Sequence, residues 1–305
     1  MRAVRVKNGK RDADALYIHD NEPDPAAGPG QLLVTIKAFG LNRMDIMQRE
    51  DKYPYPLLTD SGDIMGVEFS GIVCKIGHKC KGDFKVGDEV FGLAYGSATY
   101  FTAIQAVHLV GGLEPGQDVI VHAGASGAGQ AVIQVAKHGG AKRIFTTAGT
   151  DAKTKLCKSL GADFACNYKT GEDFAKVVAR ETDGRGVDLI IDLLGRDYWD
   201  RNIASLAMDS RIVLVALMSG GAIDEFNLRK LMNKRIWVMA TTLRTRSKEY
   251  QRELRDRFVD LALPGLADGS MRITVDKVFS WKQVGEAHKR MEANVNAGKL
   301  ICVVD

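Results

Sequence analysis

Apolar and polar residues follow two different patterns in the two halves of the chain. In the first 95 or so residues, short apolar runs are separated by glycines and polar residues, which is typical of β-strands joined by turns. Helical periodicity is weak there, apart from one short turn at residues 43–49. We therefore expect a β-rich first part. Its strands are expected at residues 1–6, 31–38, 67–76 and 85–91.

After about residue 102, short apolar β-branched runs alternate with helical patterns without a break. Strands that are apolar on both sides are expected where helices cover both faces of a parallel sheet. The alternation predicts a doubly wound parallel sheet. Strands are expected at residues 118–122, 143–147, 163–167, 187–192, 211–217 and 235–241, with helices at residues 128–138, 151–160, 173–181, 198–206 and 227–232.

The last part of the chain adds helical patterns at residues 248–262 and 282–294 and strand patterns at residues 273–279 and 300–304. Because six strands already complete the parallel sheet, we expect these elements to return to the first part. The predicted domains are residues 1–101, residues 102–241 and a returning segment, residues 242–305.

Composition narrows the class of protein. The chain has 305 residues and a net charge of +4, without a dense run of lysine and arginine, which argues against nucleic-acid binding. No run of about 18 apolar residues predicts a membrane span. The N-terminus lacks the apolar core of a signal peptide, and five scattered cysteines favour reduced thiols over disulfides. We therefore expect a cytoplasmic protein.

A glycine-rich turn between the first strand of the parallel sheet and its helix is the strongest local signal. Gly124 is expected to make the sharp exit from the strand, and Gly129 to let the helix pack closely on the sheet. The small residues Ser126, Gly127 and Ala128 let a pyrophosphate reach the N–H groups of the helix N-terminus. Because serine replaces the middle glycine of the dinucleotide motif, a tight turn without a ligand is the alternative.

The second strand of this sheet indicates which dinucleotide is bound. Sites for NAD carry an acidic residue about 20 residues after the glycine motif. Here the strand ends without an acid at residues 146–150, and Lys153 follows one helical turn later. A cation without an opposing acid suits the 2′-phosphate of NADP. We interpret Asp151 as a helix cap or first-turn charge, and a solvated lysine is the alternative for Lys153.

Five stretches carry a family resemblance. The chain resembles the zinc-free quinone oxidoreductases of the medium-chain dehydrogenase/reductase superfamily, the ζ-crystallin-like branch, and is especially similar to stress-inducible quinone oxidoreductases. The resemblance implies a GroES-like catalytic domain and a Rossmann domain, with NADPH in the cleft between them, a quinone or enone substrate and a homodimer that pairs through residues 235–241. The matching stretches are residues 41–49, 66–71, 122–129, 167–169 and 291–294.

The resemblance also implies roles for particular residues. Lys153 and Tyr168 are expected to hold the 2′-phosphate, with Gly149 close to the ribose. The alternative for Tyr168 is a half-buried tyrosine at the end of a strand. The residues expected near the nicotinamide are Met218, Ser219, Leu243 and Arg244. The alternative for the first two is a strand-end turn, and the alternative for the last two is a solvated basic loop.

The positions of the zinc ligands in related enzymes hold other residues here. Asn42 stands where zinc-dependent relatives carry a cysteine, and Val67 stands where they carry a histidine. Neither side chain is a normal zinc ligand, so no metal is expected. Hydride transfer then needs another group to polarise the carbonyl. Tyr53 is expected to donate a hydrogen bond to the developing oxyanion and Asn42 to orient substrate or nicotinamide, although loop packing and a turn asparagine are the alternatives.

The family pattern breaks at residues 91–103. In relatives this region contains further strands and a helix, and here its flanks join directly between Gly96 and Ser97, so about 30 residues, or a few strands, are missing. The catalytic domain is thus expected to lack an internal segment. Three functions stay open: an active NADPH-dependent quinone reductase, a non-catalytic NADPH-binding or redox-sensing protein, and an enoyl reductase acting on activated alkenes.

Overall fold

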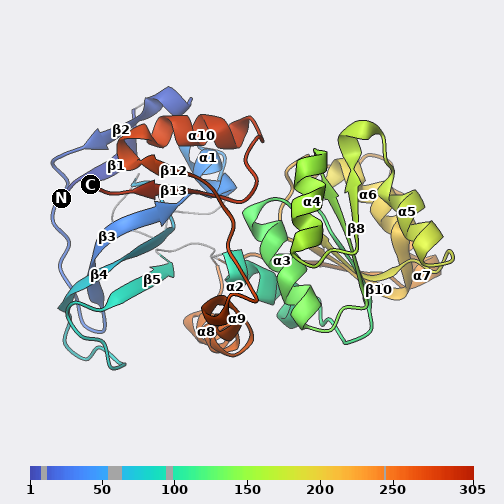
Figure 1. The fold of residues 1–305 in the computed structure, drawn as a ribbon, viewed down its shortest axis with the longest axis horizontal. Helices are drawn as coiled ribbons and strands as arrows, with labels where there is room; N and C mark the ends of the chain where they lie inside the picture. Colours follow the sequence, from blue (N-terminus) through green and yellow to red (C-terminus); the bar gives the residue numbers. More distant parts are fainter. Residues whose placement is uncertain (8–11, 54–63, 94–98, 244) are drawn as a thin grey trace. The chain divides into compact units, whose positions relative to one another are not determined.

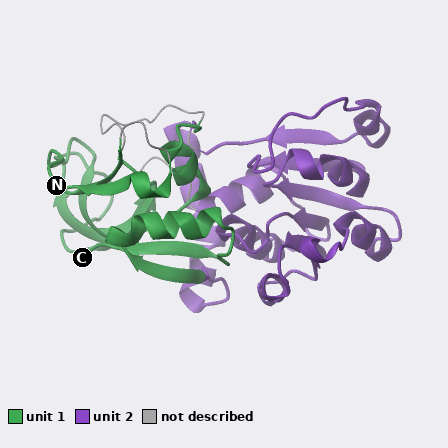
Figure 2. Ribbon diagram, turned by 90° about the horizontal axis from the view of Figure 1, so that it is seen from above, with its two compact units in different colours: residues 1–98, 275–305 green, residues 99–274 purple. Residues whose placement is uncertain are grey.

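A computed structural model of the protein describes residues 1–7, 12–53, 64–93, 99–243 and 245–305. Contacts divide the chain into two units (Figure 2). Unit 1 comprises residues Met1–Ala98 and Val275–Asp305, and unit 2 comprises residues Thr99–Thr274. Each unit has its own sheet and is described by itself.

Unit 2 is built on a parallel sheet, which confirms the predicted doubly wound fold (Figure 1). Within the described residues the sheet has six strands in the order β11-β10-β9-β6-β7-β8, and every neighbouring pair is parallel. The order reverses between β6 and β9, and ligands bind at the carboxyl ends of the strands around such a point. The strands are β6 (Asp118–Val121), β7 (Arg143–Ala148), β8 (Phe164–Asn167), β9 (Val187–Asp192), β10 (Leu206–Leu214) and β11 (Trp237–Ala240).

Helices follow these strands in the order that the pattern predicts. One face of the sheet packs against α5 and α6, whose Phe174 and Ile203 join Ile120, Phe145 and Ile190 in one buried apolar cluster. The strands are apolar because this cluster covers residues that would otherwise face water. The helices are α3 (Gly127–His138), α4 (Asp151–Ser159), α5 (Phe174–Glu181), α6 (Trp199–Ser205) and α7 (Arg229–Lys234).

Unit 2 also contains helices that precede and follow, in the sequence, the residues that form its sheet. The helix α2 (Thr99–Ile104) continues as a wider π-type turn to Val110, and sequence patterns did not predict it. Phe101 of α2 stacks on Phe258 of α8 (Lys248–Leu261), with ring centroids 4.9 Å apart. This contact keeps α8 and the following α9 (Leu263–Asp268) in unit 2. Residues 242–305 were expected to return to the first domain, whereas the structure has only Val275–Asp305 in unit 1.

Unit 1 is built on a mixed sheet that joins both ends of the chain. Its order is β12-β13-β3-β4-β5 in the described residues, with β12 parallel to β13 and the other pairs antiparallel. The predicted N-terminal strand pairs instead with β2 in a separate two-stranded sheet. The strands are β1 (Ala3–Val6), β2 (Leu16–His19), β3 (Leu32–Gly40), β4 (Glu68–Ile76), β5 (Glu89–Leu93), β12 (Val275–Ser280) and β13 (Lys299–Val303).

The core of unit 1 lies between this sheet and two helices. Ile46 of α1 (Arg43–Arg49) and Val284 of α10 (Val284–Glu292) share a buried cluster with Phe279 and Leu300. The strand β5 is an edge of the sheet in the part that the structure describes, and its Phe91 is 64% exposed. The expected junction between Gly96 and Ser97 lies outside the described residues.

None of the helices in the described ranges is long and apolar enough to cross a membrane.

Candidate functional site

The glycine-rich turn connects β6 to α3 at the carboxyl edge of the sheet. Ser126 caps α3, because its Oγ accepts a hydrogen bond of 3.0 Å from the Gly129 N–H. The first intrahelical bond runs from the Gln130 N–H to the Ser126 carbonyl, at 2.9 Å. The N–H groups of Gly127 and Ala128 come before this bond. They are therefore donors at the positive end of a helix, where phosphate oxygens bind.

Two glycines of this turn are required by close packing. A Cβ atom on Gly124 would collide with the Thr146 hydroxyl, and one on Gly129 would collide with the Ala123 carbonyl. The sharp exit that was expected at Gly124 is made by Ala123, whose φ is 52°. Gly124 is needed because β7 lies against it, and its backbone turn is ordinary.

Gly149 and Tyr168 meet at the carboxyl ends of β7 and β8. A Cβ atom on Gly149 would lie 2.6 Å from the Tyr168 hydroxyl, so only glycine lets the ring lie there. Lys153 is in the first turn of α4, where its N–H donates to the Thr150 side chain at 3.2 Å. Gly149 and Tyr168 therefore lie side by side, and Lys153 lies in the first turn of the helix that follows Gly149.

The acidic residue beside this group has a different partner. Asp151 Oδ1 accepts a hydrogen bond of 2.7 Å from Asn167 Nδ2. The cap of α4 is Thr150, so Asp151 is a first-turn charge and not the cap. The bond ties α4 to the end of β8.

The loops after β9 and β10 hold each other in place. The Met218 N–H donates to the Leu193 carbonyl at 3.2 Å, and Ser219 Oγ donates to the Leu194 carbonyl at 2.7 Å. Met218 is 45% exposed, whereas Leu243 is buried. Arg244 lies outside the described residues. Met218 and Ser219 thus stand at the same edge of the sheet as the glycine-rich turn.

A buried chain of hydrogen-bonded polar side chains lies beneath this edge, and no sequence pattern indicated its acidic residue, Asp192. Asn202 Oδ1 lies 2.6 Å from His122 Nε2, and Asn202 Nδ2 donates to Asp192 Oδ2 at 3.1 Å. Asp192 Oδ1 accepts the Leu194 N–H at 2.7 Å and so fixes the loop after β9. An acid at the end of an apolar strand next to the switch point was the available signal.

Burial shifts both titrating ends of this chain toward the neutral form. Burial raises the pKa of Asp192 to about 6, against which the Leu194 and Gly195 N–H groups act. Burial, with a smaller contribution from the Arg201 charge, lowers the pKa of His122 to about 4, against which the Asn202 hydrogen bond acts. His122 is therefore a neutral structural histidine at neutral pH.

The residues expected to contact the acceptor belong to unit 1. Asn42 immediately precedes α1, and its main-chain N–H donates to Asp45 Oδ2 at 2.6 Å. Its side-chain Oδ1 accepts a hydrogen bond of 2.9 Å from Lys299 Nζ, a residue that no sequence motif indicated. Tyr53 follows α1 and is partly buried. The distance in sequence between Asn42 and Lys299 explains why no pattern indicated the pair.

The side chains at the positions of the zinc ligands are poor metal donors. Val67 is 2% exposed and Asn42 is already bonded to lysine. Among the described residues, no three His, Cys, Asp or Glu side chains lie close enough to hold a metal ion. Cys74 is exposed and directs its Sγ to the Leu33 carbonyl.

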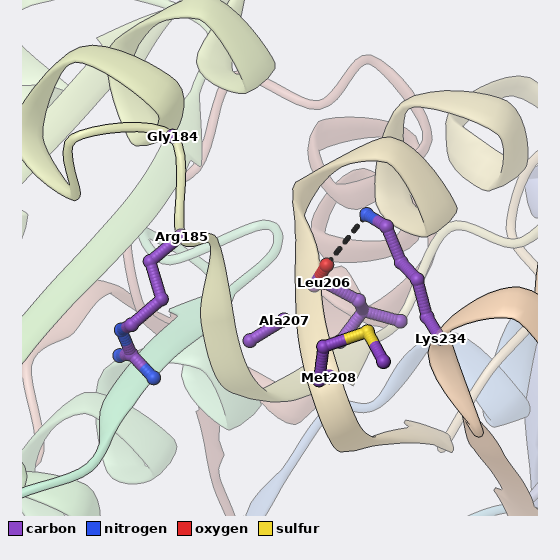
Figure 3. A pocket seen from close by; sticks show the side chains of 6 residues that line it. All are labelled: Gly184, Arg185, Leu206, Ala207, Met208 and Lys234. Atoms are coloured by element: carbon purple, nitrogen blue, oxygen red, sulfur yellow. Dashed lines mark hydrogen bonds between the residues drawn. The ribbon is translucent and has the colours of Figure 1, made fainter.

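A separate pocket lies at the other end of the parallel sheet, where β9 and β10 begin (Figure 3). Its volume is about 480 Å³, and Arg185, Met208 and Lys234 are among its lining residues. Lys234 Nζ donates to the carbonyls of Ile203, Ala204 and Leu206, so it caps the end of α6. This lysine is already saturated with acceptors, which leaves no donor of its own for an anion in the pocket.

Comparison with known proteins finds family matches in both parts of the chain. The family described as "Alcohol dehydrogenase GroES-like domain" matches residues 28–152, and "Zinc-binding dehydrogenase" matches residues 127–260. The probable quinone oxidoreductase of Schizosaccharomyces pombe is 28% identical, with 91% of this chain and 90% of that protein covered. The structure of mycobacterial Rv1454c complexed with NADPH is 25% identical, with a TM-score of 0.84 and coverage of 99% and 100%.

Other relatives differ in length. A phenolphthiocerol/phthiocerol polyketide synthase of Mycobacterium tuberculosis is 26% identical over 94% of this chain, which spans 14% of that protein. The 2-haloacrylate reductase of a Burkholderia species is 26% identical, with 99% of this chain and 98% of that protein covered. That alignment runs over 334 residues against 305 in this chain, so at least 29 aligned positions have no residue here.

The two family matches together extend from residue 28 to residue 260, across the GroES-like and the Rossmann parts. The fold of both units and the relatives that cover nearly the whole chain agree with them. The chain belongs to the medium-chain dehydrogenase/reductase superfamily, as a quinone oxidoreductase-like member.

Proposed function

We propose that the protein is an NADPH-dependent oxidoreductase that transfers a hydride to a quinone or related conjugated carbonyl without zinc. The observation that carries the proposal is the close approach of Gly149 and Tyr168, with Lys153 in the first turn of the helix that follows Gly149. It offers a cation and a phenol beside a glycine, and the neighbouring Asp151 is bonded to Asn167. This donor set fits a 2′-phosphate, which a carboxylate facing the ribose would repel.

Each part of the edge has a role in holding the cofactor. The N-terminus of α3, with Gly124, Ser126, Gly127, Ala128 and Gly129, binds the pyrophosphate. When bound, NADPH supplies the hydride. Nicotinamide contacts are assigned by family resemblance to four residues, and of these Arg244 lies outside the described residues. They are Met218, Ser219, Leu243 and Arg244.

Unit 1 supplies the residues that act on the acceptor. Tyr53 donates a hydrogen bond to the carbonyl oxygen as negative charge develops there, and Asn42 orients the substrate or the nicotinamide. Zinc-free chemistry is supported by the donors themselves, because an amide and the alkyl side chain of Val67 stand at the zinc-ligand positions. Metal analysis that finds one bound zinc per chain overturns this part.

Names of relatives support the same reaction class. Rv1454c was solved with NADPH, and the protein of Schizosaccharomyces pombe is named a probable quinone oxidoreductase. The decisive experiment measures NADPH oxidation by the purified protein across a panel of quinones, beside NADPH affinity. We expect saturable oxidation with NADPH and much slower oxidation with NADH. Equal rates with the two cofactors contradict the assignment of the 2′-phosphate site.

Two other functions are tested by the same assay. A non-catalytic NADPH-binding or redox-sensing role is favoured by the 29 or more aligned positions that this chain lacks. Tight NADPH binding with no turnover of any acceptor supports it. An enoyl reductase is favoured by the similarity to 2-haloacrylate reductase, and faster turnover of enones than of quinones supports that function.

The expected location of the protein is the cytoplasm. The exposed edge strand β11 supports a homodimer. It is an edge of the sheet in the described residues, and Trp237 and Val238 are 64% and 42% exposed. An unpaired apolar edge is suited to pairing with a second copy. Light scattering of Val238→Lys, which places a charge on this edge, should show a monomer where the wild type is a dimer.

A further inference from the structure

Lys299 is a buried lysine whose donors are all used. Its side chain is 7% exposed, and Nζ forms an ion pair with Glu68 Oε1. Nζ also donates to the Leu41 carbonyl at 3.1 Å and to Asn42 Oδ1 at 2.9 Å. An ammonium group has three donors, so these acceptors satisfy it completely. A buried charge needs such a set to offset its desolvation.

The sheet is shaped around this ion pair. A Cβ atom on Gly40 would collide with the Glu68 carboxylate and lie 3.2 Å from Lys299 Cε. The three residues come from neighbouring strands, because β13 pairs with β3 and β3 pairs with β4. The Leu41 N–H donates to the Leu300 carbonyl at 2.9 Å, which holds the segment before α1 against β13.

The lysine, together with the capping box of α1 in which the Asn42 side chain accepts from the Asp45 backbone, fixes which way the Asn42 amide faces. Because Oδ1 accepts from Lys299, Nδ2 is directed away from the ammonium group. Nδ2 is buried, and it has no hydrogen-bond partner in the part of the chain that the structure describes. A buried donor without an acceptor costs about 1–3 kcal/mol, so it calls for an explanation. An amide whose oxygen binds a cation is also a more polarised donor.

We propose that Lys299 is a positioning residue, which with Glu68 holds Asn42 so that Nδ2–H donates to the carbonyl oxygen of the acceptor. The inference rests on the proposed function and deepens it. It adds to the proposed reaction a fixed positive charge behind the donor, at the oxygen where negative charge develops. The occupant that this proposal assigns to the Nδ2 site is a conjugated carbonyl compound, the acceptor class of the proposed function.

The test is a double-mutant cycle that leaves no buried charge unpaired. Glu68→Gln/Lys299→Met removes both charges, Asn42→Ala removes the donor, and a third protein carries all changes. We expect Asn42→Ala to lower kcat about 100-fold. The charge-free pair should lower kcat about tenfold, as loss of a charge-assisted hydrogen bond does. The triple variant should match Asn42→Ala, because Lys299 acts through Asn42.

Controls separate positioning from general stability. Lys282→Met breaks an exposed ion pair with Asp305 and should leave kcat unchanged. Lys299→Arg keeps the charge and should restore part of the rate, with thermal melting measured for every variant. The inference is overturned if the triple variant shows the product of the separate effects. It is also overturned if the KM for NADPH changes while kcat does not, since Asn42 then serves the cofactor.

A binding measurement keeps this inference separate from the proposed function. In protein labelled with ¹⁵N at asparagine, the Asn42 side-chain signal is assigned by its loss in Asn42→Ala. Adding 1,4-naphthoquinone should shift that signal in the wild type and much less in Glu68→Gln/Lys299→Met. A shift without any NADPH oxidation contradicts the proposed function and supports the positioning role. An unshifted signal in the wild type contradicts the positioning role.

Discussion

The two units build their candidate sites in different ways. In unit 2, the glycine-rich turn places its donors within six consecutive residues, Gly124–Gly129, at the start of one helix. In unit 1, the Asn42 amide is fixed by Lys299, 257 positions later in the chain. A site made by one local turn depends only on that turn. A site made by distant residues depends on the whole sheet that brings them together.

The two sheets also differ in how well they are covered. The apolar side chains of the central strands of unit 2 are buried, with Ile120 and Ile190 at most 1% exposed. In unit 1, Ile36 is 45% exposed and Phe91 is 64% exposed. Apolar side chains on a sheet face usually pack against another layer. By this measure, apolar side chains on the sheet of unit 1 are less well covered than those on the central strands of unit 2.

The largest effect is expected when the local turn of unit 2 is broken. Gly129→Ala forces a Cβ atom against the Ala123 carbonyl, so α3 must move off the sheet. We expect a loss of about 3 kcal/mol in the free energy of unfolding, typical of overpacking, together with loss of NADPH binding. Urea unfolding and fluorescence titration measure the two. Gly221→Ala, which meets only the flexible end of Leu217, is the control and should be near neutral.

The buried chain of unit 2 predicts opposite pH dependences for its two ends. The native pKa of Asp192 is about 6, above its ordinary value of 3.8. Between these values the native state holds more protons, so this contribution to stability falls as pH rises. As the pH rises from 4 to 6, the free energy of unfolding of Asp192→Asn should therefore increase by about 3 kcal/mol relative to that of the wild type, at 1.36 kcal/mol per pKa unit.

The histidine end has the reverse sign. The native pKa of His122 is about 4, below its ordinary value of 6.5, so its contribution to stability rises with pH in that window. As the pH rises from 4 to 6.5, the free energy of unfolding of His122→Gln should decrease by about 3 kcal/mol relative to that of the wild type. Urea unfolding across this range measures both variants. Curves that stay parallel to the wild type would mean that neither group is held neutral by burial.

Removal of one charge in unit 2 should separate the two dinucleotides. Lys153→Ala removes the cation assigned to the 2′-phosphate, and a charge-assisted hydrogen bond contributes about 1.5–3 kcal/mol. We expect NADPH affinity to fall about 10- to 100-fold while NADH affinity changes little. Lys155→Ala, on the exposed side of the same helix, is the matched control. An equal loss for both cofactors would show that Lys153 stabilises α4 instead.

The same contrast explains what could be predicted from the sequence. The strands and helices of unit 2 and its glycine turn follow from local patterns and the order of a doubly wound sheet. The roles of Gly149 and Tyr168 were expected from the family resemblance. Lys299 could not be predicted, because a buried lysine has no periodicity of its own and its partners lie in other strands. Residues 242–274 belong to unit 2 and contact it through long-range pairs such as Phe101 on Phe258, which no local pattern indicated.

The smallest effect is expected at the phenol of unit 1. Tyr53 follows α1, the helix that begins beside Asn42, so both residues depend on the placement of one helix. Tyr53→Phe keeps the ring and removes only the hydroxyl, so we expect kcat for quinones to fall about tenfold or less, with little change in thermal melting. Tyr17→Phe, in the separate two-stranded sheet, is the control. If Tyr53→Phe and Asn42→Ala both keep wild-type turnover, unit 1 does not polarise the acceptor. Reduction would then depend on the cofactor unit alone, and the contrast between the two units would concern stability and not chemistry.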